Sequence, residues 1–133
     1  MSATLPGDVN PAIADSAPLF RAYGDDFIQI GDMCCKSGLC IHHGNIITPW
    51  GPERLRDLIP EHLHSLVDKP PEVLMIGTGR VTAFPSEPVL DMLADAHIGY
   101  ECMDTRSAAR TYNILVGEGR SVSAAMLLPS ARN

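Results

Sequence analysis

The chain has 133 residues and a formal net charge of −6, with 45% hydrophobic and 20% charged residues. This length is enough for one domain with a hydrophobic core, and the composition is globular rather than disordered. The negative net charge argues against broad binding to nucleic acid or to an acidic membrane surface. No window approaches the roughly 18 uninterrupted apolar residues that a membrane-spanning helix needs. The first residues also lack the basic and apolar regions of a secretory signal.

The first half of the chain predicts an arm followed by antiparallel strands. Residues 1–17 are rich in Ala, Pro, Asp and Ser without periodicity, which indicates a flexible arm before a single domain at residues 18–133. Glycine-containing turns separate short apolar and β-branched runs. These runs predict strands at residues 27–30, 33–35, 39–43 and 46–48. We therefore expect an N-terminal antiparallel β-meander.

The second half alternates predicted helices and strands. The expected elements in chain order are a helix at 60–67, a strand at 73–76, a helix at 86–97, a strand at 99–103, a helix at 104–116 and a strand at 121–128. Such alternation predicts crossover connections between parallel strands. The fold class is therefore α/β (α+β): a single three-layer domain with a mixed central sheet, helices on it, and the meander at one side.

The carboxyl ends of strands 73–76 and 99–103 mark the predicted functional surface. Gly77-Thr78-Gly79-Arg80 follows the first strand, and Asp104-Thr105-Arg106 follows the second. Neighbouring parallel strands end at the same edge of a sheet, where open α/β sheets bind ligands. The start of helix 104–116 adds backbone donors, and Arg110 lies one turn beyond Arg106. We predict a crevice for an anion or an acidic peptide; the alternative is that these arginines are simply solvated.

Other motifs do not identify a reaction. Gly77-x-Gly79 lacks the third glycine of a dinucleotide fingerprint and the Gly-Lys-Ser/Thr of a P-loop. There is no Gly-x-Ser-x-Gly elbow, and no neighbouring group indicates a lowered pKa for Cys102. We therefore expect no catalytic residue and no cofactor.

Cysteine and histidine residues invite a metal interpretation that their spacing does not support. Cys40-x-His42-His43 follows Cys34-Cys35, but the paired Cys-x-x-Cys spacing of zinc sites is missing. We expect no metal, a buried Cys40 and partly exposed histidines. The four cysteines are expected to be reduced thiols in a cytosol-like compartment. The only tryptophan, Trp50, lies between two prolines and is expected to anchor the packing of the meander against the helical half.

Several blocks resemble one family over about residues 17–128. These blocks are Ala22-Tyr23-Gly24, Pro49-Trp50, Met75-Ile76-Gly77-Thr78-Gly79, Met103-Asp104-Thr105, Arg110-Thr111-Tyr112-Asn113-Ile114-Leu115 and Glu118-Gly119-Arg120-x-Val122. In this order they resemble the domain-of-unknown-function family 498, with the Mth-938-like fold, which includes the mitochondrial complex I assembly factor 3. The resemblance implies a compact three-layer domain. It also implies that Gly77, Thr78, Gly79, Asp104, Thr105, Arg110, Thr111, Tyr112, Asn113 and Arg120 are the motif positions, which we add to the candidate binding surface. Ala109 stands where relatives often carry cysteine, which argues against essential thiol chemistry there.

The resemblance also implies a function. We expect a non-enzymatic protein-interaction domain that assists assembly of a respiratory NADH dehydrogenase (complex I). Its partners would be respiratory complex subunits or assembly factors, with no nucleic acid and no direct membrane insertion. The short arm, without an Arg/Ser-rich presequence, suggests a bacterial cytoplasmic protein that reaches the inner membrane through a partner. The alternative is a small-ligand or anion-binding protein, or an unrecognised enzyme, using the crevice between the Gly77–Arg80 loop and the helix at 104–116.

Overall fold

The computed structural model describes residues 17–133, so the predicted arm lies outside the described residues except for Ala17. In chain order the elements are β1 (Phe20–Gly24), β2 (Phe27–Ile30), β3 (Met33–Cys35), β4 (Leu39–His42), β5 (Asn45–Ile47), η1 (Leu55–Asp57), η2 (Pro60–Leu66), β6 (Val73–Gly77), α2 (Glu87–Asp95), β7 (Gly99–Met103), α3 (Thr105–Gly117) and β8 (Val122–Met126). Among these helices, none has the length and apolar character needed to cross a membrane.

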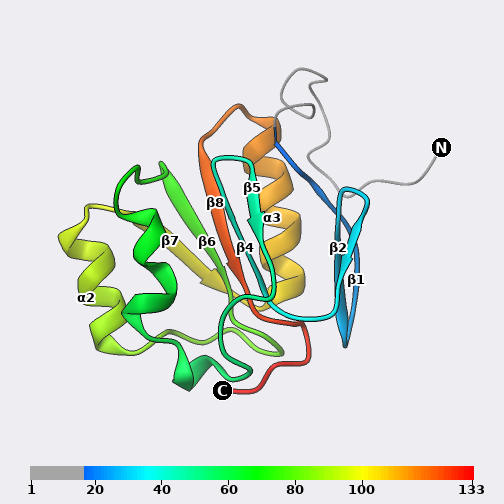
Figure 1. Ribbon diagram of the computed structural model, residues 1–133, viewed down its shortest axis with the longest axis horizontal. Coiled ribbons are helices and arrows are strands. Elements are labelled where there is room, and N and C mark those ends of the chain that lie inside the picture. The colour runs from blue at the N-terminus through cyan, green and yellow to red at the C-terminus, as the bar shows by residue number, and fades with distance from the viewer. Residues whose placement is uncertain (1–16) are drawn as a thin grey trace.

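The strands form two sheets (Figure 1). The larger sheet has the order β5-β4-β8-β6-β7, and the smaller one has the order β1-β2-β3. β6 is parallel to both of its neighbours, with Met75 paired to Glu101 of β7 and to Ala124 of β8. β4 is antiparallel to β5 and β8, which makes the larger sheet mixed. This arrangement confirms the predicted mixed sheet with parallel strands joined through helices.

Alternate side chains of β6 face two separate hydrophobic cores. Met75 packs with α3 and with β1 and β2 of the smaller sheet, whereas Leu74 and Ile76 pack with η2 and α2 on the opposite face. Every residue of β6 is buried, because the strand is covered on both faces and paired along both edges. The domain is therefore built of three layers, as the sequence predicts.

Helix α3 begins and ends where its sequence indicates. The Asp104 carboxylate accepts a hydrogen bond from the Ser107 backbone N–H at 3.1 Å, which satisfies one of the unpaired donors of the first turn. The buried face carries Ala108, Ala109 and Tyr112, whose spacing is that of one helical stripe. After Gly117 the chain turns at Gly119, whose φ of 82° favours glycine.

The first half of the chain differs from the predicted meander in its pairing. The predicted strands are present, but β2 and β3 belong to the smaller sheet while β4 and β5 belong to the larger one. The break occurs because β4 pairs with the buried strand β8, which removes Leu39 to Ile41 from solvent. The sequence analysis missed β1, which pairs with β2 across the turn at Asp25 and Asp26.

The segment expected to be a helix at 60–67 is a 3-10 helix, η2, that begins at Pro60. Its buried side chains are Leu63 and Leu66, three residues apart, which matches the three-residue turn of this helix type. Trp50 lies partly buried against the same core, and its indole N–H donates to the His62 carbonyl at 2.9 Å. Trp50 thus anchors the strand half to the helical half, which confirms its predicted role.

Candidate functional site

The two predicted loops meet at the carboxyl ends of β6 and β7. The Thr78 N–H donates to the Met103 carbonyl at 2.9 Å, and the Thr105 N–H donates to the Gly79 carbonyl at 3.0 Å. The Thr105 hydroxyl accepts from the Gly79 N–H at 2.9 Å and donates to the Leu127 carbonyl at 2.8 Å. One threonine side chain therefore connects the ends of three neighbouring strands. We name these hydrogen-bonded residues, 77–79, 103–105 and 127, the strand-end junction.

The strand-end junction is closed internally. Thr78 and Thr105 have relative exposures of 0% and 1%, and their hydroxyl groups bond within the fold. A Cβ atom placed on Gly79 would lie 2.3 Å from the Ala131 carbonyl oxygen, so the C-terminal segment covers this loop. A Cβ atom on Gly77 would lie 2.5 Å from the Met126 sulfur. The glycines are thus required by close packing, and the solvent-facing group of the loop is Arg80.

The arginines of the predicted surface lie in different places. Arg106 pairs with Asp25 at 2.7 Å, with side-chain exposures of 37% and 78%. Arg110 donates to the Tyr23 hydroxyl and to the Ser107 hydroxyl. Both side chains therefore reach from α3 towards β1 and the turn after it. Because these ion-pair groups are exposed, we assign little stability to them.

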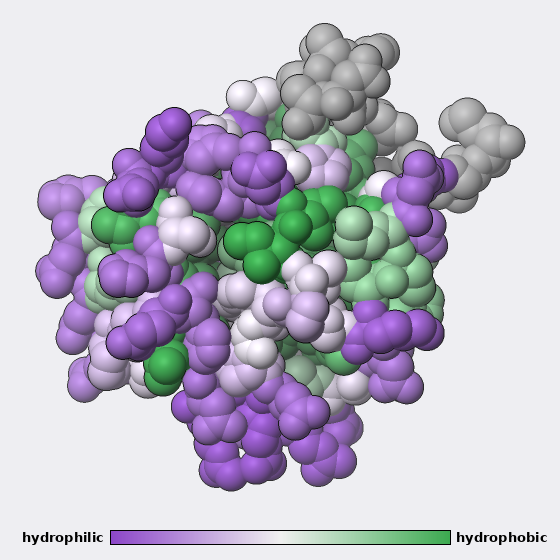
Figure 2. Space-filling view, in the orientation of Figure 1, coloured by the Kyte–Doolittle hydropathy of each residue, from purple (hydrophilic) through white to green (hydrophobic). Residues whose placement is uncertain are grey.

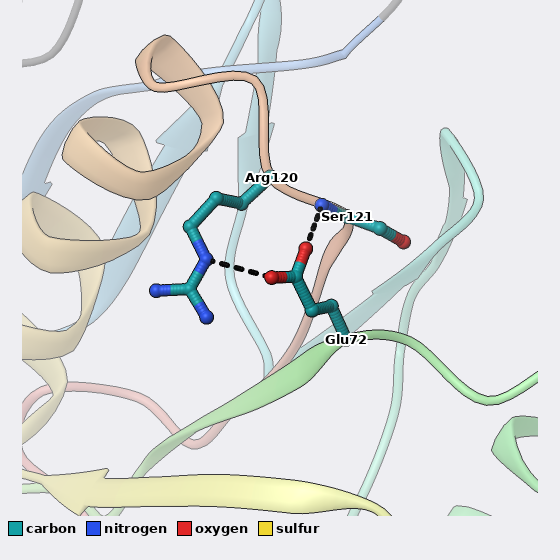
Figure 3. A network of polar contacts seen from close by, with 3 residues as sticks. All are labelled: Glu72, Arg120 and Ser121. Carbon is teal, nitrogen blue, oxygen red and sulfur yellow. Dashed lines mark hydrogen bonds and ion pairs between the residues drawn. The ribbon is translucent and has the colours of Figure 1, made fainter.

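Arg120 lies at the other end of α3. Its Nε atom donates to a Glu72 carboxylate oxygen at 3.1 Å, and the second oxygen of Glu72 accepts from the Ser121 N–H at 3.4 Å (Figure 3). Helix α3 has 13 residues, so about 20 Å of helix separates this network from the strand-end junction. The structure therefore groups Arg120 with the start of β6 rather than with the two loops.

The end of the Arg-Thr-Tyr-Asn motif holds β1 against α3. The Asn113 amide accepts from the Phe20 N–H at 2.9 Å and donates to the Phe20 carbonyl at 2.8 Å. The Tyr112 hydroxyl donates to the Pro18 carbonyl at 3.0 Å, and its ring packs edge-on against Phe20. Thr111 donates to the Met103 sulfur at 3.4 Å. Sequence reasoning missed this role, although a buried amide on an apolar helix face is a signal of such a contact.

A hollow of about 590 Å³ lies beside the strand-end junction. The C-terminal segment that covers Gly79 forms one wall through Ser130 and Ala131, and Trp50 forms another. Its charged lining residues are Lys36, Arg54, Arg132, Asp26 and Glu53. Within residues 17–133 the only ion pairs are Arg106–Asp25 and Arg120–Glu72, so the three cations of the hollow are unpaired there. We call this the basic hollow; sequence reasoning missed it because its cations come from three distant segments.

Three of the four cysteines, Cys35, Cys40 and Cys102, are buried or partly buried, whereas Cys34 is exposed. Burial raises the pKa of Cys40 to about 12, and burial with the charge of Glu101 raises the pKa of Cys102 to about 11. Burial lowers the pKa of His42, whose Nδ1 atom is 2.8 Å from the Ser123 hydroxyl. In the part of the chain that the structure describes, no three His, Cys, Asp or Glu side chains are grouped to hold a metal ion.

Relatives of known sequence resemble the chain to different extents. A protein of Rhodobacter capsulatus is 35% identical over 123 residues, covering 91% of this chain and 93% of the relative. The 13 kDa major membrane protein of Francisella tularensis is 32% identical over 69 residues, covering 52% of this chain and 56% of that protein. The mouse NADH dehydrogenase [ubiquinone] 1 alpha subcomplex assembly factor 3 is 28% identical over 112 residues, covering 80% of this chain and 60% of that protein. The chain thus spans little more than half the length of two of these relatives.

Solved structures show the same fold. A crystal structure of a Bordetella parapertussis protein matches with a TM-score of 0.76 and 33% identity, over 85% of this chain and 97% of the other. A solution structure of a Bordetella pertussis protein, described as a Mth938-like domain, matches with a TM-score of 0.72 and 30% identity, over 96% and 94% of the two chains. The family model described as "Protein of unknown function (DUF498/DUF598)" matches residues 20–127. The chain therefore belongs to the DUF498/DUF598 family.

Proposed function

We propose that this domain is a non-enzymatic interaction module that assists assembly of a respiratory NADH dehydrogenase by binding protein subunits or other assembly factors. The observation that carries the proposal is the similarity to the mouse assembly factor, which extends over 112 residues and 80% of this chain. A similarity of this length extends well beyond a short motif. We further propose that it works in the cytoplasm of a bacterium, at the inner membrane through its partners.

The loop after β6 offers a surface suited to a protein partner. Phe84 is 67% exposed and Val81 is 53% exposed, and both follow Arg80 in a segment held to the fold by the Thr78 hydroxyl. These two exposed apolar side chains, three residues apart in one loop, offer apolar surface to a partner. Arg80 beside them is exposed and adds a charge that can pair with an acidic partner segment. This surface includes Arg80 of the predicted crevice and adjoins the strand-end junction.

The test combines a deletion with purification of tagged protein. A strain without the protein is expected to accumulate less fully assembled NADH dehydrogenase, as measured by native gel electrophoresis and NADH oxidation by membranes. Tagged wild-type protein is expected to recover dehydrogenase subunits, and Arg80→Ala with Phe84→Ser is expected to recover fewer. The matched control is Ile114→Ser, which changes a 40% exposed side chain on α3. Normal assembly in the deletion strain would refute the proposal.

A second candidate function is binding of a small anion or another small ligand, with an unrecognised enzymatic activity as its extension. The basic hollow favours it, because Lys36, Arg54 and Arg132 converge on one concave surface without ion pairs among residues 17–133. The strand-end junction adjoins this hollow through the C-terminal segment, because Ala131 both packs over Gly79 and lines the hollow. A ligand present at 100 times its Kd would add about 2.7 kcal/mol to the free energy of unfolding. Thermal melts with phosphate and with carboxylic acids would detect this, and no stabilisation would count against it.

A further inference from the structure

A second surface, formed by η2 and α2, carries a hydrophobic floor with an acidic border. The hollow between them has a volume of about 400 Å³ and is lined by His64, Val67, Pro88, Asp91, Met92, Asp95 and Ala96. Val67 is 37% exposed, and the hollow lies on the face of the sheet opposite α3. On the side where α2 and η2 lie, Figure 2 shows small hydrophobic areas bordered by hydrophilic surface. We call this hollow the α2 groove.

The residues of α2 that line the groove follow two helical rows. Pro88, Met92 and Ala96 are spaced four residues apart and form the apolar row. Asp91 and Asp95, also four residues apart, run beside it and form the acidic row. Because both rows follow one helix, the lining residues extend along the helix axis. From Pro88 to Ala96 they rise by about 12 Å, at 1.5 Å per residue, which matches about two turns of an α-helix.

The acidic row is unfavourable for the isolated domain. Like charges four residues apart on a helix repel each other, and Asp95 is the last residue of α2, where the helix dipole favours a cation. No basic residue occupies the last turn of α2, and neither aspartate has an ion pair within residues 17–133. The sequence contains no lysine or arginine from Val81 to Thr105. His64 is the one lining residue that can carry a positive charge, and it makes no ion pair with either aspartate within residues 17–133. A cationic ligand would therefore complement the two carboxylates of the groove.

We propose that the α2 groove binds a basic amphipathic helix of a partner protein. Apolar residues of that helix at positions i, i+4 and i+7 would contact Val67 and Met92 on the floor. Lysine or arginine residues one turn apart would pair with Asp91 and Asp95, whose spacing they match. This inference rests on the proposed protein-interaction function and adds a surface and the chemistry of the segment that it takes.

The charge on the groove selects among other occupants. A second copy that docked through the same groove would bring the acidic rows of two molecules together, and like charges at a contact oppose association. Nucleic acid and acidic membrane surfaces are repelled for the same reason. A neutral apolar helix would leave both carboxylates unpaired beside it, at the cost of their solvation. A basic helix is the occupant that satisfies both rows.

The probe is a synthetic helical peptide of leucine and lysine, with leucine at i, i+4 and i+7 and lysine along both sides. Titration into the full chain, followed by amide NMR, is expected to shift the resonances of residues 64–67 and 88–96. A matched peptide with glutamate in place of lysine is expected to bind at least about tenfold more weakly, and affinity for the lysine peptide is expected to fall with added salt. Shifts centred elsewhere would overturn the proposal, and so would equal binding of the two peptides.

Variants of the groove separate local pairing from net charge. Asp91→Asn with Asp95→Asn is expected to weaken the lysine peptide by about tenfold or more, while the Tm stays the same or rises because the repulsion is removed. Glu101→Gln with Glu118→Gln changes the net charge equally at exposed sites outside the groove, and is expected to leave affinity nearly unchanged. Equal losses in the two double variants would refute specific binding to the groove.

The same variants distinguish this inference from the proposed function. The double variant Asp91→Asn with Asp95→Asn could bind the peptide poorly but still recover dehydrogenase subunits in full. The groove would then not be the surface used for assembly, and only the proposed function would be supported. If the deletion strain assembles the dehydrogenase normally while the lysine peptide maps to the groove, peptide binding by the groove is supported and the proposed assembly function is refuted. Val67→Ser, which removes apolar floor at a partly exposed position, is expected to weaken the peptide severalfold without unfolding the chain.

Discussion

Replacing Asn113 by alanine is expected to loosen β1 from α3 and destabilise the whole domain. The amide of Asn113 is 1% exposed and makes both hydrogen bonds to the backbone of Phe20, at 2.9 and 2.8 Å. The substitution leaves one buried N–H and one buried C=O without partners, and each such group costs about 1–3 kcal/mol. We therefore expect a loss of about 3 kcal/mol in the free energy of unfolding.

Urea unfolding followed by circular dichroism measures this loss. With an m value of about 1.5 kcal/mol/M, a loss of about 3 kcal/mol lowers the midpoint by about 2 M urea. Native-state hydrogen exchange is expected to show faster exchange at the amides of β1 and β2 than at those of β6. A Tyr112→Phe variant, which loses only the bond to the Pro18 carbonyl, is expected to lose about 1 kcal/mol.

The neighbouring residue supplies the control for Asn113→Ala. Ile114 is 40% exposed on the same helix, so Ile114→Ala is expected to change stability by less than about 0.5–1 kcal/mol. If Asn113→Ala and Ile114→Ala have the same midpoint, the Asn113 amide does not hold the two layers together. The motif would then require another explanation, such as direct contact with a ligand.

Three further predictions concern the strand-end junction and the titratable side chains. Gly79→Ala is expected to cost about 2–4 kcal/mol in urea unfolding, because φ is +100° and the new Cβ meets the Ala131 carbonyl oxygen at 2.3 Å; wild-type stability would contradict that packing. Burial lowers the pKa of His42, so the unfolded chain binds a proton more readily, and the free energy of unfolding should fall as pH drops below about 6.5. His42→Gln should remove the part of this pH dependence that His42 contributes. A variant with the same pH profile of stability as the wild type would contradict this prediction. The exposed Cys34 should react with a thiol reagent at pH 8 before the other cysteines, because at that pH the raised pKa of Cys102 leaves about one thiol in a thousand as thiolate. Equal reaction rates of Cys34 and Cys102 in the native protein would be inconsistent with the burial of Cys102.

The sequence predicted the second half of the fold well because its signals are local. The run at 73–76 is apolar throughout, as a strand covered on both faces requires, and β6 is buried along its whole length. Asp104 precedes the helical stripe and caps α3 as its position indicates. The crossover through α2 then brings Gly79 and Thr105 together, because the neighbouring parallel strands β6 and β7 end at the same edge of the sheet.

The parts that the sequence did not predict depend on distant contacts. β1 has weak alternation, and its fixed position depends on Asn113, which is 93 residues away in the chain. Pairing of β4 with β8 also joins distant segments, so a local meander signal cannot show that the strands separate into two sheets. The basic hollow forms only because Lys36, Arg54 and Arg132, which are far apart in the sequence, line one surface. The close packing of Ala131 over Gly79 also joins distant residues, so the Gly-x-Gly motif alone could not predict it.

The basic hollow and the α2 groove differ in the sign of their charge. At the basic hollow three cations outnumber two carboxylates, whereas Asp91 and Asp95 border the α2 groove without a nearby lysine or arginine in sequence. A domain under selection for stability alone gains by mixing the two signs on each face, since like charges repel and ion pairs offset them. Separate surfaces of opposite sign would let one small domain hold an acidic and a basic partner segment at once, without competition between them. If the two sites work in this way, saturating the α2 groove with the lysine peptide should leave binding at the basic hollow unchanged.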